Sequence, residues 1–152
     1  MWCYNERKGT DYEDPLLIQA HQHFENAIKL DPAFSDSHAY LSYCHIWEVV
    51  QNISKDPKQS LSLVLASAQK DENLNPENPL AYNGLATSNL FTGDHATARD
   101  YAQTAIKLNP SYAPSYWRLS IVSAHYGDFG EAEKMVLRLL NSVLLIQKSP
   151  IF

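Results

Sequence analysis

The sequence is poor in cysteine and shows no sign of export. Only two cysteines occur among its 152 residues, and Cys3 and Cys44 have neither a CxxC motif nor the spacing of metal ligands. Isolated thiols of this kind fit a reducing compartment, so we expect a cytoplasmic protein. The first residues lack a basic segment followed by an apolar stretch, and no signal peptide is predicted.

Long hydrophobic runs and excess basic charge are also missing. The longest uninterrupted apolar runs, such as Val143 to Ile146, are short, whereas a helix needs ~20 apolar residues to cross a bilayer. The 12 basic residues are outnumbered by 17 acidic ones, and the formal net charge is −5. A nucleic-acid-binding surface needs clustered basic residues. We therefore expect neither membrane insertion nor a nucleic-acid partner.

Common catalytic motifs are absent. The sequence contains no GxxxxGK[ST] loop, no GxGxxG and no HExxH. No serine or cysteine has a partner that its spacing would bring close. With 45% hydrophobic and 19% charged residues, the chain still has the composition of a globular protein. We expect a protein that is not an enzyme and that needs no cofactor.

Six histidines raise the question of a metal site. No pair of them has the i, i+4 spacing of helical zinc ligands, and His21 and His23 point to different sides of a helix. We therefore expect no metal ligands; zinc binding is the alternative, which elemental analysis of purified protein would decide. We expect His38 and His45 to pack between helices, and His95 and His125 to lie near helix ends.

The sequence does contain a repeated phrase. "HFENAIKLDPAFSDSHAYLS", from His23 to Ser42, returns as "YAQTAIKLNPSYAPSYWRLS", from Tyr101 to Ser120. Pro76 and Pro110 are 34 residues apart, and Pro32 and Pro76 are 44 residues apart, so the second unit carries ten extra residues. A unit of about 34 residues is typical of a helix–turn–helix repeat.

Helix boundaries recur within each unit. Capping residues followed by proline predict helix starts, because proline has no N–H to lose in the first turn. Glycines in the left-handed conformation predict helix ends. The predicted starts are Asp14-Pro15, Ser35 or Asp36, Asp56-Pro57, Asn78-Pro79, Asp94 and Asp128, the last with Glu131 as a capping box, and the predicted ends include Leu74, Gly93 and Gly127.

The pattern resembles the tetratricopeptide repeat family over about residues 15–132. The resemblance rests on Ala20, Phe24, Ala27 and Pro32 in the first unit and on Tyr82, Leu85, Ala86, Ala98, Ala102, Ala105 and Pro110 in the third. It implies an all-α solenoid, a right-handed superhelix of about seven to eight helices. The implied organisation is a partial leading helix at 1–14, an array at 15–134 with units at about 15–34, 35–78, 79–112 and 113–134, and a divergent C-terminal helix or tail at 135–152.

Two departures from the pattern carry expectations. Asp71 occupies the position that Ala27 and Ala105 hold in other units, so its helix is expected to pack less tightly or to be rotated. Both ends of the chain read like cuts through a longer array. The tail holds Leu144, Leu145, Ile146, Ile151 and Phe152, which predicts a missing neighbour or self-association.

The repeats also resemble those of two more specific groups of proteins. The phrase "AIKLDPAFSDSHAYLS" and the long second unit look like repeats that follow bacterial class III adenylate or guanylate cyclases, and similar repeats follow winged-helix transcriptional regulators. These likenesses imply a bacterial signalling protein. They leave an alternative function, a regulatory or sensory tail whose active domain lies outside this chain.

In the resembled family the first helix of each unit lines a concave groove, which implies a scaffold that binds a peptide or partner protein. Aromatic residues and arginine are the types most enriched at interaction hot spots. A subtype of the family, the carboxylate clamp, grips a C-terminal carboxylate with lysines, asparagines and an arginine at fixed groove positions. The matching positions here are Ala39, Tyr43, Gly84, Pro114 and Arg118. Only Arg118 fits, so a C-terminal chaperone tail is a poor candidate ligand. The predicted groove residues are Tyr43, Trp47, Asn83, Thr87, Phe91, Trp117, Arg118, Ile121 and His125.

Overall fold

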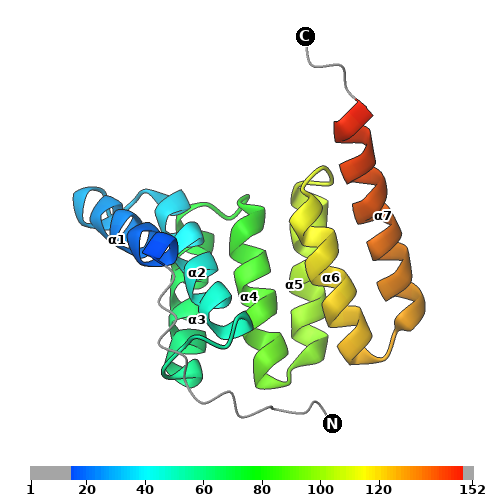
Figure 1. Ribbon diagram of the computed structural model, residues 1–152, viewed down its shortest axis with the longest axis horizontal. Coiled ribbons are helices and arrows are strands. Elements are labelled where there is room, and N and C mark those ends of the chain that lie inside the picture. Colours follow the sequence, from blue (N-terminus) through cyan, green and yellow to red (C-terminus); the bar gives the residue numbers. More distant parts are fainter. Residues whose placement is uncertain (1–14, 149–152) are drawn as a thin grey trace.

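The computed structural model describes residues 15–148, with side chains described to residue 141. The leading helix predicted at 1–14, and Ile151 and Phe152 of the tail, lie outside the described residues. Within them the chain forms seven α-helices and no strand (Figure 1): α1 Pro15–Leu30, α2 Ser35–Val50, α3 Pro57–Leu74, α4 Pro79–Thr92, α5 His95–Leu108, α6 Ala113–Tyr126 and α7 Phe129–Lys148. The predicted all-α architecture is confirmed.

The helix ends follow the local chemistry that predicted them. The Asp56 carboxylate accepts hydrogen bonds from the backbone N–H groups of Lys58 and Gln59, both at 3.1 Å, at the start of α3. Gly93 and Gly127 end α4 and α6 with φ of 88° and 93°, a conformation that costs glycine little. The other side-chain caps are Asn78 on Leu80 N–H, Asp94 on Thr97 N–H and Asp128 on Glu131 N–H.

Helix α2 begins at Ser35, as predicted, but without a side-chain cap. Neither Ser35 nor Asp36 caps α2; the N-cap is Phe34, whose side chain makes no capping hydrogen bond. The Asp128–Glu131 box is also only half formed. The Glu131 carboxylate accepts from the Ser123 hydroxyl at 2.8 Å and pairs with Arg99 at 2.7 Å. It therefore ties α7 to α5 and α6 instead of closing its own cap.

A hydrogen bond repeated in three units explains the aromatic residue and the proline of the repeated phrase. The hydroxyls of Tyr82 and Tyr116 donate to the carbonyls of Pro76 and Pro110, at 2.9 and 2.8 Å. In the first copy the ring of His38 takes the place of tyrosine, with Nε2 3.1 Å from the Pro32 carbonyl. Each bond spans the turn between two successive helices and fixes how they meet.

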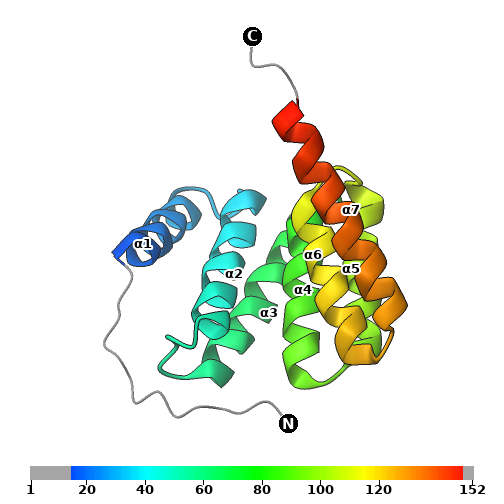
Figure 2. The ribbon, with the colours of Figure 1, turned by 45° about the vertical axis from the view of Figure 1, so that its right-hand side comes forward.

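Helices α2 to α7 stack side by side, and α1 leans at an angle against α2 (Figures 1 and 2). The Cα trace of α4 comes within 8 Å of both α2 and α6, whereas α5 comes that close to neither α3 nor α7. Helices α2, α4 and α6 are therefore the more closely spaced layer. This layer is the inner side of the curved stack, because the helices on the inside of a bend lie closer together.

Small residues bring the helices together. Ala98, Ala102 and Ala105 of α5 are completely buried, and Ala86 and Ala102 share one core cluster with Leu119. Helices approach most closely where the contact residues are small. Gly84 of α4 lies at a close approach of this kind. A Cβ atom added there would lie 2.7 Å from Oγ of Ser42.

Of the two outcomes predicted for the helix of Asp71, looser packing or rotation, the structure excludes rotation. Asp71 faces inward and is completely buried on α3. Its two carboxylate oxygens accept hydrogen bonds from Nδ2 of Asn78, at 3.2 and 3.0 Å. Burial raises the pKa of Asp71 to about 7; the Asn78 hydrogen bond opposes this shift and Asp36 adds to it. The helix is thus not rotated away, and a polar contact fills the alanine position.

Two further features concern the ends of the array. The boundary proposed at residue 134 falls inside α7, which runs unbroken from Phe129 to Lys148. On α7, Phe129, Leu137 and Leu140 are exposed; self-association through this end of the chain stays a prediction.

No helix among residues 15–148 combines the length and the apolar character that crossing a membrane requires.

Candidate functional site

The predicted groove residues other than Arg118 form one stripe on each helix of the inner layer. Tyr43 and Trp47 are four residues apart on α2, and residues at this spacing share a helix face. The same spacing joins Asn83, Thr87 and Phe91 on α4 and Trp117, Ile121 and His125 on α6. Because α4 lies between α2 and α6, the three stripes run side by side.

Three large aromatic residues of these stripes are half exposed. The exposed fraction is 45% for Trp47, 47% for Phe91 and 52% for Trp117. An aromatic side chain whose role is to fill a core would lose nearly all of its exposure. These three residues therefore remain available for contact with another molecule.

Two of the predicted groove residues are too deeply buried to contact a partner. Asn83 and Thr87 are almost completely buried. Nδ2 of Asn83 donates to Oγ of Ser115 at 3.1 Å, and the Thr87 hydroxyl donates to the Asn83 carbonyl at 2.7 Å. The Asn83 side chain thus links α4 to α6, whereas Thr87 bonds to its own helix, and a partner cannot reach either without opening the stack.

The C-terminal end of the α6 stripe is mixed. Ile121 is half buried and packs against Leu90, Ala98 and Val122. His125 is exposed, and its Nδ1 lies 2.9 Å from the Ile121 carbonyl, so this nitrogen carries the proton and donates. The exposed His125 side chain can thus contact a partner. Only the part of Ile121 that is not packed against the core can do so.

Arg118 is a charged residue of the inner layer that is nearly buried. It is the one Lys, Arg, Asp or Glu on α4 and α6, yet only 8% of it is exposed. Its Nε has no hydrogen-bond partner among the described residues. Burial lowers the pKa of the guanidinium, and the Tyr43 phenol acts in the opposite direction. Arginine stays charged at neutral pH, so the site holds a nearly buried positive charge without a counter-ion from residues 15–141.

Two further tyrosines, Tyr40 and Tyr112, interact with each other, Tyr112 also interacts with Tyr43, and neither of the two was predicted. Burial, with further contributions from the phenols of Tyr43 and Tyr40, raises the pKa of Tyr112 to about 12. Tyr40 also stacks on Phe24 of α1, with ring centroids 5.3 Å apart. We call Tyr40, Tyr43, Tyr112 and Arg118 the tyrosine–arginine cluster. The phenols could not be assigned to it from sequence, because α2 and α6 approach each other only across α4.

A hollow adjoins the cluster between α1 and α2. Its volume is about 360 Å³, and mostly apolar side chains line it. Tyr43 and Trp47 form part of the wall, so two predicted groove residues face this space. The full lining is Leu17, Phe24, Tyr40, Tyr43, Cys44 and Trp47.

The histidines have different surroundings in the structure. His38 is buried and makes the repeated turn contact described above, as its assignment to packing predicted. His95 and His125 lie near helix ends with ring centroids 6.1 Å apart. His21 and His45, however, come together with Glu48 from two different helices. The spacing argument missed this pair, because it considered only ligands on one helix.

Comparison with known proteins identifies the architecture. No protein-family model and no curated protein sequence matches the chain. Solved structures do match: MamA 41-end from Desulfovibrio magneticus RS-1 is 14% identical, with 88% of this chain and 69% of that one covered and a TM-score of 0.62.

Two other solved structures carry the name of the repeat. TTC0263, a thermophilic TPR protein in Thermus thermophilus, is 16% identical, with 85% of this chain and 74% of that one covered and a TM-score of 0.68. The second TPR of Spaghetti (RPAP3) bound to an HSP90 peptide is 15% identical, with coverages of 82% and 93% and a TM-score of 0.53. The chain therefore has the fold of tetratricopeptide repeat proteins, as its repeated phrase predicted.

Proposed function

We propose that this chain is a non-catalytic interaction module that binds an extended peptide, or an extended segment of a partner protein, on its inner face. The observation that carries the proposal is Arg118, a nearly buried guanidinium whose Nε has no described partner. A buried charge without a counter-ion costs several kcal/mol. An acidic group of a ligand would offset this cost.

The surroundings of Arg118 suit such a ligand. Half-exposed Trp47, Phe91 and Trp117 offer apolar area on three neighbouring helices, and tryptophan and arginine are the residue types most enriched at hot spots. Arginine recognises carboxylates through two parallel hydrogen bonds. We infer a ligand with an acidic side chain or terminus at Arg118 and apolar side chains on either side.

One compared structure supports this ligand class. The second TPR of Spaghetti is bound to the peptide SRMEEVD, which contains three acidic residues. A complete carboxylate clamp is not proposed here, because Ala39, Tyr43, Gly84 and Pro114 offer no lysine or asparagine. No described residue favours the alternative, a regulatory tail of a cyclase or transcriptional regulator.

The proposal predicts the behaviour of Arg118→Met. Peptides selected from a random display library on wild-type protein should be enriched in Asp or Glu beside apolar residues. Their affinity for Arg118→Met should fall about 10- to 100-fold, because a hydrogen bond to a charged group contributes ~1.5–3 kcal/mol. Isothermal titration calorimetry with the selected peptides measures this loss.

The matched control is Arg138→Met, an exposed arginine on α7 outside the inner layer. It should bind the selected peptides like wild type. Thermal unfolding supplies a second check, because methionine in place of an unpaired buried charge should leave the stability equal or higher. Selected peptides without acidic enrichment, or equal binding by Arg118→Met, would refute the assignment of Arg118.

A further inference from the structure

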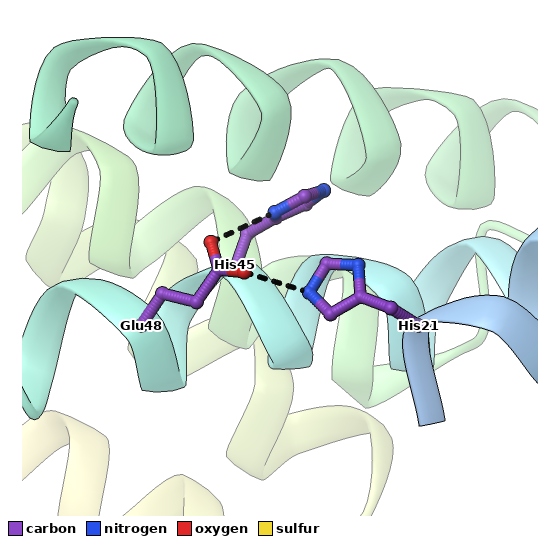
Figure 3. A group of neighbouring side chains, drawn as sticks. All are labelled: His21, His45 and Glu48. Atoms are coloured by element: carbon purple, nitrogen blue, oxygen red, sulfur yellow. Dashed lines mark hydrogen bonds and ion pairs between the residues drawn. The ribbon is translucent and has the colours of Figure 1, made fainter. Parts of the chain in front are cut away.

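Three side chains with metal-binding atoms meet between α1 and α2, outside the tyrosine–arginine cluster. His21 comes from α1, and His45 and Glu48 come from α2 (Figure 3). One ligand atom of each lies within 4.8 Å of the other two. In Figure 3 both imidazoles turn a ring nitrogen toward the same carboxylate. The group is therefore convergent, although its members are far apart in sequence.

The distances fit a metal ion with nitrogen and oxygen ligands. Nε2 of His21 lies 3.0 Å from Oε1 of Glu48, and Nδ1 of His45 lies 3.3 Å from Oε2. Tetrahedral zinc with bonds of ~2.0–2.1 Å spaces its ligand atoms about 3.3 Å apart. Each nitrogen thus lies at about this distance from one of the two carboxylate oxygens, although the two contacts use different oxygens.

The close contact between His21 and Glu48 is not a hydrogen bond. Nε2 of His21 is buried and has no hydrogen-bond partner among the described residues, although the Glu48 carboxylate is only 3.0 Å away. The two groups are close without the angle of a hydrogen bond. A cation between the three side chains would satisfy this buried nitrogen, which makes no hydrogen bond to any described residue.

A second layer of polar groups orients Glu48. The Ser60 hydroxyl of α3 donates to Oε2 of Glu48 at 3.1 Å, and Oγ of Ser54 lies 2.8 Å from Oγ of Ser60. Metal sites commonly hold their carboxylates by such hydrogen bonds. Beside the group lies a cavity of about 380 Å³ that His21, His45 and Glu48 help to line, so space exists for a fourth ligand.

We propose that His21, His45 and Glu48 bind one divalent transition-metal ion of the zinc type between α1 and α2. Two imidazoles and one carboxylate are a known zinc ligand set, with the fourth position left to water or to a bound molecule. Nitrogen donors favour zinc and its neighbours in the first transition row over magnesium or calcium. The ion would fasten α1, which has no buried residue and packs on α2 alone among the described helices.

A metal ion that fixes α1 on α2 would also affect the inner face. Leu17 of α1 lines both the cavity beside the histidines and the hollow beside Tyr43, and Phe24 of α1 stacks on Tyr40. A metal that holds α1 in place would therefore also hold one wall of that hollow. This consequence rests on the proposed function, whereas the metal site does not.

The test is a zinc titration of untagged, chelator-stripped protein in competition with a chromogenic zinc chelator. Wild type should bind one zinc ion per chain, and magnesium should not compete. His21→Ala, His45→Asn and Glu48→Gln should each weaken zinc binding by at least about 100-fold, since even the loss of a supporting second-layer group costs 10- to 100-fold. Circular dichroism establishes that each variant is folded.

Two controls separate the site from other ligands. His23→Ala removes an exposed histidine two residues from His21 on the same helix, and Cys3→Ser removes a thiol outside the described residues. Both should bind zinc like wild type. Absence of zinc binding by wild type, or wild-type affinity in His21→Ala and Glu48→Gln, would overturn the proposal, and so would an equal loss in His23→Ala.

A measurement of stability distinguishes a metal site from a group that merely pairs charges. Zinc in excess should raise the thermal midpoint of wild type, because a ligand that binds only the folded state stabilises it. It should also slow hydrogen exchange of α1, and His21→Ala should show neither effect. If zinc leaves both quantities unchanged in wild type, the three side chains form a hydrogen-bonded contact and no metal site. Because these readouts need no peptide, their failure is independent of the proposed function.

Discussion

Replacement of Asp71 by asparagine should stabilise the protein at about pH 8 by several kcal/mol. Asp71 is completely buried, and its pKa is raised from 3.8 to about 7, mainly by that burial. Above pH 7 the folded chain therefore holds a buried carboxylate, and at ~1.4 kcal/mol per pKa unit its ionisation costs up to about 4 kcal/mol. Asparagine keeps an oxygen that can accept from Nδ2 of Asn78 but carries no charge.

The pH dependence gives the sign of the effect. Between the unfolded pKa of Asp71 and its folded pKa of about 7, the folded chain binds the additional proton, so the free energy of unfolding falls as pH rises. The contribution of this group is fully present below the unfolded value and is lost as pH passes through 7. The advantage of Asp71→Asn should therefore be largest near pH 8 and should vanish toward pH 4.

Urea unfolding of both proteins across this pH range, followed by circular dichroism, measures the difference. Asp100→Asn is the matched control, because Asp100 is an exposed aspartate on α5; it should shift stability by less than about 0.5 kcal/mol at every pH. A constant difference between Asp71→Asn and wild type from pH 4 to pH 8 would contradict the raised pKa of Asp71.

The second large effect concerns Gly84, where α4 lies against α2 and α3. A Cβ atom at this position would lie 2.7 Å from Oγ of Ser42 and 2.8 Å from Cβ of Ala68. Ser42 is held by its own hydrogen bond to the Val64 carbonyl, so neither neighbour moves easily. Gly84→Val should lower the free energy of unfolding by about 3 kcal/mol or more, because extra carbons force packed helices apart.

Gly130→Val is the control for this substitution. Gly130 also lies in a helix, but the atom nearest to its added Cβ, Oδ1 of Asp128, is 3.8 Å away. Valine there should be tolerated. The double variant Gly84→Ala/Ala68→Gly should recover part of the stability lost in Gly84→Ala, since the carbon that the new Cβ meets is gone. Equal stability of Gly84→Val and wild type would refute the close approach at Gly84.

Helix positions could be predicted from sequence because their signals are local. Asp56-Pro57 and Asn78-Pro79 each contain a cap and a proline within two residues, and Gly93 ends its helix through its own φ. The period of the phrase then fixes the order in which the helices stack. These signals required no knowledge of contacts between distant residues.

The site was less accessible from sequence, because its properties depend on neighbouring helices. Asn83 and Thr87 have the right register for the groove but are buried, and Asn83 bonds to Ser115 of α6. The position of Arg118 was predicted, whereas its burial without a described counter-ion appears only in the structure. Pairing of His21 with His45 joins two helices, which a rule about spacing along one helix cannot detect.

The most direct test of the inner face as a binding surface is chemical-shift mapping by NMR with one peptide selected on the wild-type protein. The proposed function predicts that the largest shifts fall on α2, α4 and α6, around Tyr43, Trp117 and Arg118, and that Tyr43→Ala/Trp117→Ala abolishes them while the helical content is kept. Shifts concentrated on α3, α5 and α7, or unchanged binding by the double variant, would contradict it.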